Sequence, residues 1–274
     1  NWFMMYFLSV VLIGTVYPIF LEVIQNEKIS VGPPFFNELI IPLLIPFLFL
    51  MSFGPSFKWV KHSFKLVNIK LILLFILSTF ISFLILINTE LNSLFVSVLI
   101  IFSIYLTFTT IKDFLIKNQI NFSQKLSHFG FSLLILSIII NGTFSKEITT
   151  NIEVGEKFKN NNVVIYFEKI SALKEKNYMS IVGNFKIKEN DKNEILLKPE
   201  LRIFNQPTTV TSEADIKVSL TEDKFLVMNL VKGNDYYNIR YQTKPFMIWI
   251  WLSATIMCVG PLINFVKKKR YNEK

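Results

Sequence analysis

Very few side chains in this sequence could do chemistry. Among 274 residues there are two histidines, His62 and His128, and one cysteine, Cys258. A single cysteine allows neither a disulfide framework nor a cysteine-based metal site, and in an apolar segment it is usually a small buried hydrophobe. The most polar stretch, residues 145–244, has no histidine and no cysteine, and it shows no catalytic triad, paired carboxylates or phosphate loop. The sequence therefore does not predict a hydrolytic enzyme.

His128 is the main candidate because it lies about one turn into an apolar segment, residues 126–144. An ionisable side chain is costly inside a membrane and is a functional-site hypothesis by default. The alternative is a hydrogen-bonded packing histidine near a helix end, and position alone leaves both open. No acidic residue lies at its helical neighbours, so a carboxylate–histidine proton relay has no local partner. A neutral imidazole suits an axial ligand of heme iron, although no other span offers a second histidine.

The other polar features favour structural explanations. His62 lies among Lys58, Lys61 and Lys65, where contact with water or lipid headgroups is expected. The run from Pro207 to Asp215, which contains Thr208, Thr209 and Glu213, predicts a turn that leads into a strand.

The elements that must position these residues are mainly apolar helices. The chain is 51% hydrophobic, with 28 phenylalanines and a mean hydropathy of +0.44, which is too apolar for a soluble domain of this size. Six stretches are close to the ~20 residues needed to cross a bilayer. They are residues 2–24, 37–55, 71–88, 94–111, 126–144 and 245–266.

The sequence predicts a membrane α-helical bundle of about six transmembrane helices with an inserted extracytoplasmic all-β domain. Residues 1–144 hold five helices, residues 145–244 form a β-barrel or sandwich, residues 245–266 form the sixth helix, and 267–274 are a basic cytoplasmic tail. In the β domain, runs rich in Val, Ile, Phe and Tyr alternate with turn residues. The predicted strands are 147–154, 162–170, 179–188, 195–204, 214–219, 224–232 and 236–243.

Prolines and small residues give two of these helices special character. Pro33 and Pro34 predict a stiff loop over residues 29–37, and Pro42 and Pro46 predict a kinked or locally unwound second span. Small and polar residues in the fifth span predict close packing against other helices. They include Gly130, Ser132, Ser137 and Asn141.

Charge predicts the topology through the positive-inside rule. Twelve basic residues lie in two loops and the tail: Lys58, Lys61, Lys65, Lys70, Lys112, Lys117, Lys125, Lys267, Lys268, Lys269, Arg270 and Lys274. The opposite connections carry only Lys28, so both termini are expected on the cytoplasmic or matrix side and the β domain outside. The net charge of +9 follows from this topology, and nucleic acid is not an expected partner.

Five segments, in the same order and across most of the chain, resemble the CcmF family of membrane heme lyase components in cytochrome c maturation. The fifth-span segment Ser127-His128-Phe129-Gly130 resembles the family's AHLG motif. The others are Gly14–Pro18 with Ile29–Asn37, the proline-rich Pro42–Pro55, Pro207–Ile216, and Lys244–Leu252. The resemblance covers the C-terminal portion of the family's sequence, and the family's tryptophan-rich heme-handling segment is not among these residues.

The resemblance implies a protein that takes heme from the heme chaperone CcmE and helps attach it to CXXCH cysteines of apocytochrome c, together with the thioredoxin-like CcmH. It implies that His128 is an axial ligand of a membrane heme b, with its second ligand in the N-terminal portion of the protein. The membrane would be the bacterial or the mitochondrial inner membrane. The chain begins at Asn1, which suggests a truncated or split protein. A transporter segment, or a non-catalytic scaffold with a docking β domain, remains the alternative.

Overall fold

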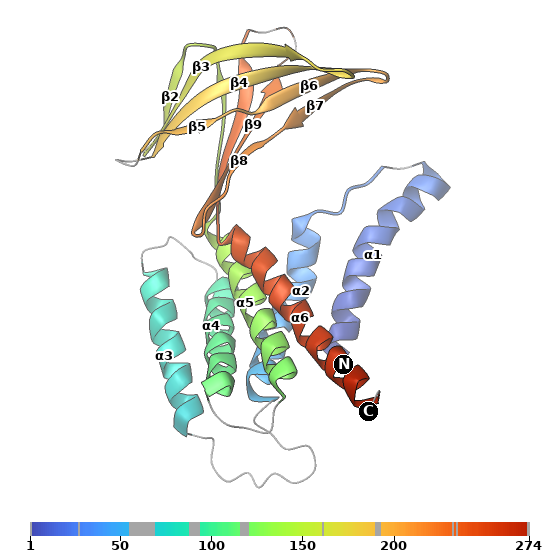
Figure 1. The fold of residues 1–274 in the computed structure, drawn as a ribbon, viewed down its shortest axis with the longest axis vertical. Coiled ribbons are helices and arrows are strands. Elements are labelled where there is room, and N and C mark those ends of the chain that lie inside the picture. The colour runs from blue at the N-terminus through green and yellow to red at the C-terminus, as the bar shows by residue number, and fades with distance from the viewer. Residues whose placement is uncertain are drawn as a thin grey trace. The chain divides into compact units, whose positions relative to one another are not determined.

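The computed structural model describes residues 2–26, 28–54, 69–87, 94–115, 121–160, 162–189, 193–231, 233 and 235–272. The chain divides into two compact units. One comprises Asn1–Ile139 with Leu252–Lys274, and the other is Ile140–Trp251. Five helices precede ten strands, and a sixth helix follows them (Figure 1).

Six helices are long and apolar enough to cross a membrane, as predicted. They are α1 (Trp2–Gln25), α2 (Pro33–Phe53), α3 (Ile69–Leu86), α4 (Leu94–Leu115), α5 (Phe122–Phe144) and α6 (Met247–Asn272). Apolar side chains of α2, α4 and α5 form a common core, in which Leu48, Leu99 and Leu106 are buried.

The start of α2 corrects the prediction of a loop over 29–37. The helix begins at Pro33, with prolines in its first two positions. The first N–H groups of a helix have no intrahelical acceptor, so a proline there removes no hydrogen bond and its fixed φ suits the helix. Pro42 and Pro46 do not unwind α2, which is helical without interruption from Pro33 to Phe53, so that alternative is wrong, while the kink stays a prediction.

Three other helix ends also extend beyond the apolar stretches. α4 continues from the predicted 111 to Leu115, α5 starts at Phe122 instead of 126, and α6 continues to Asn272 through the predicted tail. Hydropathy marks only the segment that lipid surrounds, whereas backbone hydrogen bonding continues into polar surroundings. His128 therefore lies in the second turn of α5.

Small residues bring α5 and α6 into close contact, which confirms the predicted packing of the fifth span. A Cβ atom at Gly130 would lie 2.6 Å from the Met257 nitrogen, and one at Gly260 would lie 2.7 Å from the Ser123 carbonyl oxygen. Ser123 Oγ donates a short hydrogen bond to the Gly260 carbonyl. Only glycine permits backbones to approach this closely.

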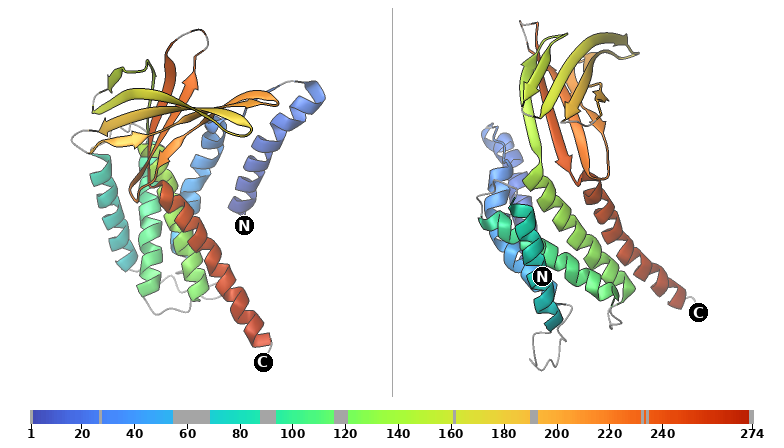
Figure 2. Two further views of the ribbon diagram at one scale, coloured as in Figure 1. Left: turned by 45° about the horizontal axis from the view of Figure 1, so that its top comes forward. Right: turned by 90° about the vertical axis from the view of Figure 1, so that its left-hand side faces the viewer.

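The β domain is a sandwich of two antiparallel sheets, which Figure 2 shows from two further directions. One sheet has the order β1-β10-β9-β8, and the other has the order β2-β3-β4-β6-β7 with β5 on β4. The strands are β1 (Lys146–Ile152), β2 (Lys157–Asn160), β3 (Val163–Lys174), β4 (Tyr178–Glu189), β5 (Ile195–Leu197), β6 (Glu200–Asn205), β7 (Thr208–Glu213), β8 (Asp215–Lys217), β9 (Glu222–Leu230) and β10 (Tyr237–Pro245).

Alternating apolar side chains from both sheets form the core of the sandwich. Phe167 and Phe185 stack at its centre with ring centroids 4.1 Å apart. The first and last strands are neighbours, with Lys146 opposite Thr243, so the chain enters and leaves the domain side by side. Asn141 Nδ2 donates to the Pro245 carbonyl at 2.7 Å and ties the end of α5 to the end of β10.

Three strand predictions need correction. The predicted strand 195–204 is interrupted at Lys198 and Pro199, because proline has no N–H for the ladder. The short, charged β2 has too weak a pattern to be recognised. β7 lies where a turn was predicted: the turn is confined to residues 206–207, and the polar run from Thr208 to Glu213 pairs with β6 as a solvent-exposed edge strand.

Candidate functional site

His128 lies on the face of α5 that packs against α2 and α4. It is half-buried, and Phe131 and Ser132 share its face three and four residues further on. The Phe131 ring is 6.0 Å from that of Phe47 on α2. Ser132 Oγ lies 3.0 Å from Thr110 Oγ1 on α4. Its neighbours Ser127 and Gly130 contact α6, so His128 points toward a different part of the bundle.

An acidic side chain from α4 lies near this histidine. The contacts Thr110–Ser132 and Phe114–Phe129 show that α4 and α5 run antiparallel here. This register brings Asp113, one turn beyond Thr110, to the level of His128, one turn before Ser132. The Asp113 carboxylate pairs with Lys112 Nζ at 3.8 Å. Both partners of that pair are largely buried.

The sequence contains no acidic residue at the helical neighbours of His128, and the structure adds Asp113 from another helix at the same level. It escaped sequence reasoning because it lies beyond the predicted end of its span at 111 and on a different helix from His128. The short connection between α4 and α5 predicts an antiparallel hairpin, but the register of the two helices comes from the contacts of Thr110 with Ser132 and of Phe114 with Phe129.

The surroundings of His128 fit a single bond to heme iron better than a metal centre built by the chain alone. Within the described residues, no group of three His, Cys, Asp or Glu side chains could hold a metal ion. In the same residues, the His128 side chain makes no hydrogen bond, and its ring nitrogens are not sealed from the surface. An imidazole in this state can accept an axial bond. His62 lies outside the described residues.

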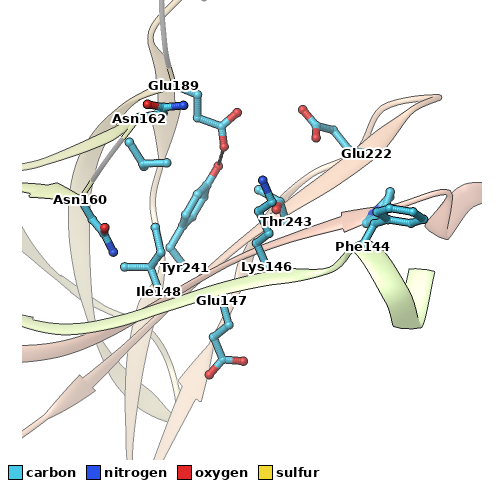
Figure 3. Close-up of a pocket in the computed structure, with 12 residues that line it drawn as sticks. Phe144, Lys146, Glu147, Ile148, Asn160, Asn162, Glu189, Glu222, Tyr241 and Thr243 are labelled. Carbon is cyan, nitrogen blue, oxygen red and sulfur yellow. Dashed lines mark hydrogen bonds between the residues drawn. The ribbon is translucent and has the colours of Figure 1, made fainter. Parts of the chain in front are cut away.

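A second candidate site is a cavity of about 750 Å³ within the β domain (Figure 3). Its lining comes mainly from β1, β10 and the loop between β2 and β3, together with the ends of neighbouring elements. The residues are Phe144, Lys146, Glu147, Ile148, Asn160, Asn162, Val163, Glu189, Glu222, Tyr241, Thr243 and Pro245. Figure 3 shows the Tyr241 hydroxyl directed at Glu189, and Glu147 on the opposite side of the strands.

The polar groups of this cavity are engaged with one another. Tyr241 Oη donates to Glu189 at 2.6 Å, and Lys224, almost fully buried, pairs with Glu189 and, at 3.6 Å, with Glu222. Burial, followed by the hydrogen bond to Glu189, raises the pKa of the Tyr241 hydroxyl far above its usual value. Tyr241 therefore remains a neutral hydrogen-bond donor at physiological pH. The arrangement satisfies the buried polar groups of Tyr241, Lys224 and Glu189.

Comparison with known proteins finds relatives that match both units of the chain. Residues 143–245 match the family described as the CcmF C-terminal beta-sandwich. The cytochrome c-type biogenesis protein CcmF of Pseudomonas fluorescens is 24% identical over 97% of this chain and 42% of its own length. The CcmF proteins of Haemophilus influenzae and Escherichia coli K12 are each 24% identical, over 99% and 93% of this chain.

A solved structure titled cytochrome c heme lyase CcmF shares the fold. It superposes with a TM-score of 0.72 at 21% identity and covers 95% of this chain and 44% of that protein. The chain thus spans less than half the length of the relatives it matches.

The six apolar helices and the β-sandwich together define a multi-pass membrane protein with an inserted β domain. More specifically, the chain is similar in sequence and fold to the C-terminal part of CcmF proteins, which confirms the resemblance found in the sequence.

Proposed function

We propose that this chain forms the C-terminal part of a membrane heme lyase, which transfers heme from the chaperone CcmE to the CXXCH cysteines of apocytochrome c. CcmH and the N-terminal portion of the same protein would be the other partners. The observation that carries this function is the half-buried imidazole of His128, which faces α2 and α4 in a chain with the fold of a heme lyase. Heme content of the purified protein tests it, because a scaffold or transporter would be colourless.

In this function one ring nitrogen of His128 would hold the iron of a heme b, and residues outside this chain would supply the other protein ligand. The bound heme supplies one-electron redox chemistry. The chain's own residues would bind the heme iron and orient the imidazole that holds it. The α2–α4–α5 packing fixes the direction of the imidazole, and Gly130 lets α6 close against the opposite side of α5.

Asp113 is proposed as a positioning residue for His128. A carboxylate beside a metal-ligating histidine commonly fixes its orientation and raises its basicity, and losing such a partner typically lowers affinity about 10- to 100-fold. We expect Asp113→Asn to weaken heme retention by about that factor and to raise the midpoint potential of the remaining heme. A negative charge near the iron ligand stabilises the oxidised state, so removing that charge raises the midpoint potential. Redox titration of the b-type absorbance measures it.

Lys112→Gln is the matched control for Asp113→Asn. If Asp113 serves only to neutralise Lys112, the two variants break the same ion pair and should change heme retention and the midpoint potential in the same way. If Asp113 acts on His128, removing the lysine charge lowers the midpoint potential instead. An unchanged potential in Asp113→Asn protein that retains heme would contradict the positioning role while leaving the heme site intact.

We also propose that the β domain faces the periplasm, or the intermembrane space, from the corresponding inner membrane. The twelve basic residues on the opposite side support this orientation. With Cys258 replaced by serine, a cysteine at the exposed Asn193 should react with an impermeant thiol reagent in intact cells. A cysteine at Ser63, outside the described residues, should react only after permeabilisation. The reverse pattern would refute the topology.

A further inference from the structure

The turn between β8 and β9, residues 218–221, presents apolar side chains to its surroundings. Val218 is 58% exposed and Leu220 is 69% exposed, although short polar turns are expected at this position. The turn has a defined conformation. The Ser219 N–H donates to Asp223 at 3.0 Å, and Ser219 Oγ donates to the Glu222 carbonyl at 2.6 Å. Polar groups are thus bonded within the turn, and the apolar ones point out of it.

Two hydrogen bonds fix this turn beside the start of α6. The Phe246 N–H donates to the Thr221 carbonyl at 2.9 Å. The indole Nε1 of Trp249 donates to the Leu220 carbonyl at 2.8 Å. Thr221 and Leu220 are therefore held within a hydrogen-bond length of residues 246 and 249, at the level of the first turn of the helix.

The first turn of a spanning helix lies at the membrane–water interface. The apolar span of α6 runs from Met247 to Phe265, and its start carries two tryptophans, the residue type enriched at that interface. Trp251 is 69% exposed. Because the turn is bonded to Trp249, the side chain of Leu220 lies at the same depth as the tryptophans.

We propose that the β8–β9 turn is a lipid-contact element, whose Val218 and Leu220 side chains enter the boundary between headgroups and acyl chains beside Trp249. Exposed apolar clusters beside an interfacial helix end mark membrane contact. The ligand class is the bilayer itself. This site is additional to heme handling, because it requires neither His128 nor any partner protein.

Depth-dependent fluorescence quenching tests this contact in the protein reconstituted into phosphatidylcholine–phosphatidylglycerol nanodiscs. On a Cys258→Ser background, Leu220→Cys carries an environment-sensitive fluorophore. The matched control is Leu230→Cys, which is 50% exposed and ten residues further along the chain, at the far end of β9 and about 26 Å from the start of that strand. Both positions are exposed, so labelling does not require a change in the core.

We expect the label at 220 to emit at shorter wavelength and to be quenched at least twofold more strongly by lipids spin-labelled near the headgroup than the label at 230. Aqueous iodide should quench 230 more strongly than 220. Equal behaviour of the two labels would overturn the proposal, since the turn would then be in water. Protection of 220 from both quenchers would also overturn it, because protein rather than lipid would cover the turn.

Discussion

Replacement of His128 by alanine is expected to remove or severely weaken the b-type heme absorbance of the complete protein, purified with its N-terminal portion. One of two protein–iron bonds is lost, and a cavity the size of an imidazole replaces it. Exogenous imidazole should therefore restore part of the spectrum by occupying that cavity. The absorbance of oxidised and dithionite-reduced protein, with and without imidazole, measures both effects.

His62→Ala is the control, because the sequence places that residue in a basic loop away from the bundle interior. It should leave the absorbance unchanged. If His128→Ala protein showed normal heme content and normal reduction, His128 would be reduced to a packing role. The similarity to CcmF proteins would survive that result, since it rests on the β-sandwich and the fold.

The sequence was informative wherever one physical requirement dominates. A bilayer demands about 20 apolar residues, so the six spans could be located, and alternating apolar residues in a segment such as Ile165–Phe167 revealed strands of the sandwich. His128 could be singled out because an ionisable group in a span is rare.

The sequence was less informative where pairing between distant segments decides the structure. Asp113 became relevant only through the register of α4 against α5, which Thr110 and Ser132 fix. β7 forms because β6 lies beside it, not because Thr208–Glu213 has an apolar pattern. α2 can begin at Pro33 because the first N–H groups of a helix have no intrahelical acceptor. A pair of prolines fits a turn equally well, so the sequence alone did not indicate that a helix starts there.

Glu189→Gln is expected to destabilise the β domain strongly. Glu189 and Lys224 have side chains that are 12% and 8% exposed, and the change leaves the lysine charge buried without its nearest partner. Breaking a buried ion pair by removing one partner typically costs about 3–5 kcal/mol, and the remaining contact of Lys224 with Glu222 at 3.6 Å favours the lower end. The Tyr241 hydroxyl also loses its charged acceptor. Thermal unfolding followed by β-sheet circular dichroism measures the loss.

Two further variants test whether the loss of stability comes from breaking the buried ion pair or from a general sensitivity of the β domain to substitution. The double replacement Glu189→Leu with Lys224→Met removes both charges at similar volume, so it should be more stable than Glu189→Gln, as expected when desolvation of the charges offsets their attraction. Glu168→Gln breaks the solvent-exposed pair between Lys186 and Glu168, which lies 3.0 Å apart on neighbouring strands, and should leave the unfolding midpoint unchanged. If Glu189→Gln unfolded at the same temperature as Glu168→Gln, water would have to reach Lys224 in solution, and the cavity beside Tyr241 would be its route.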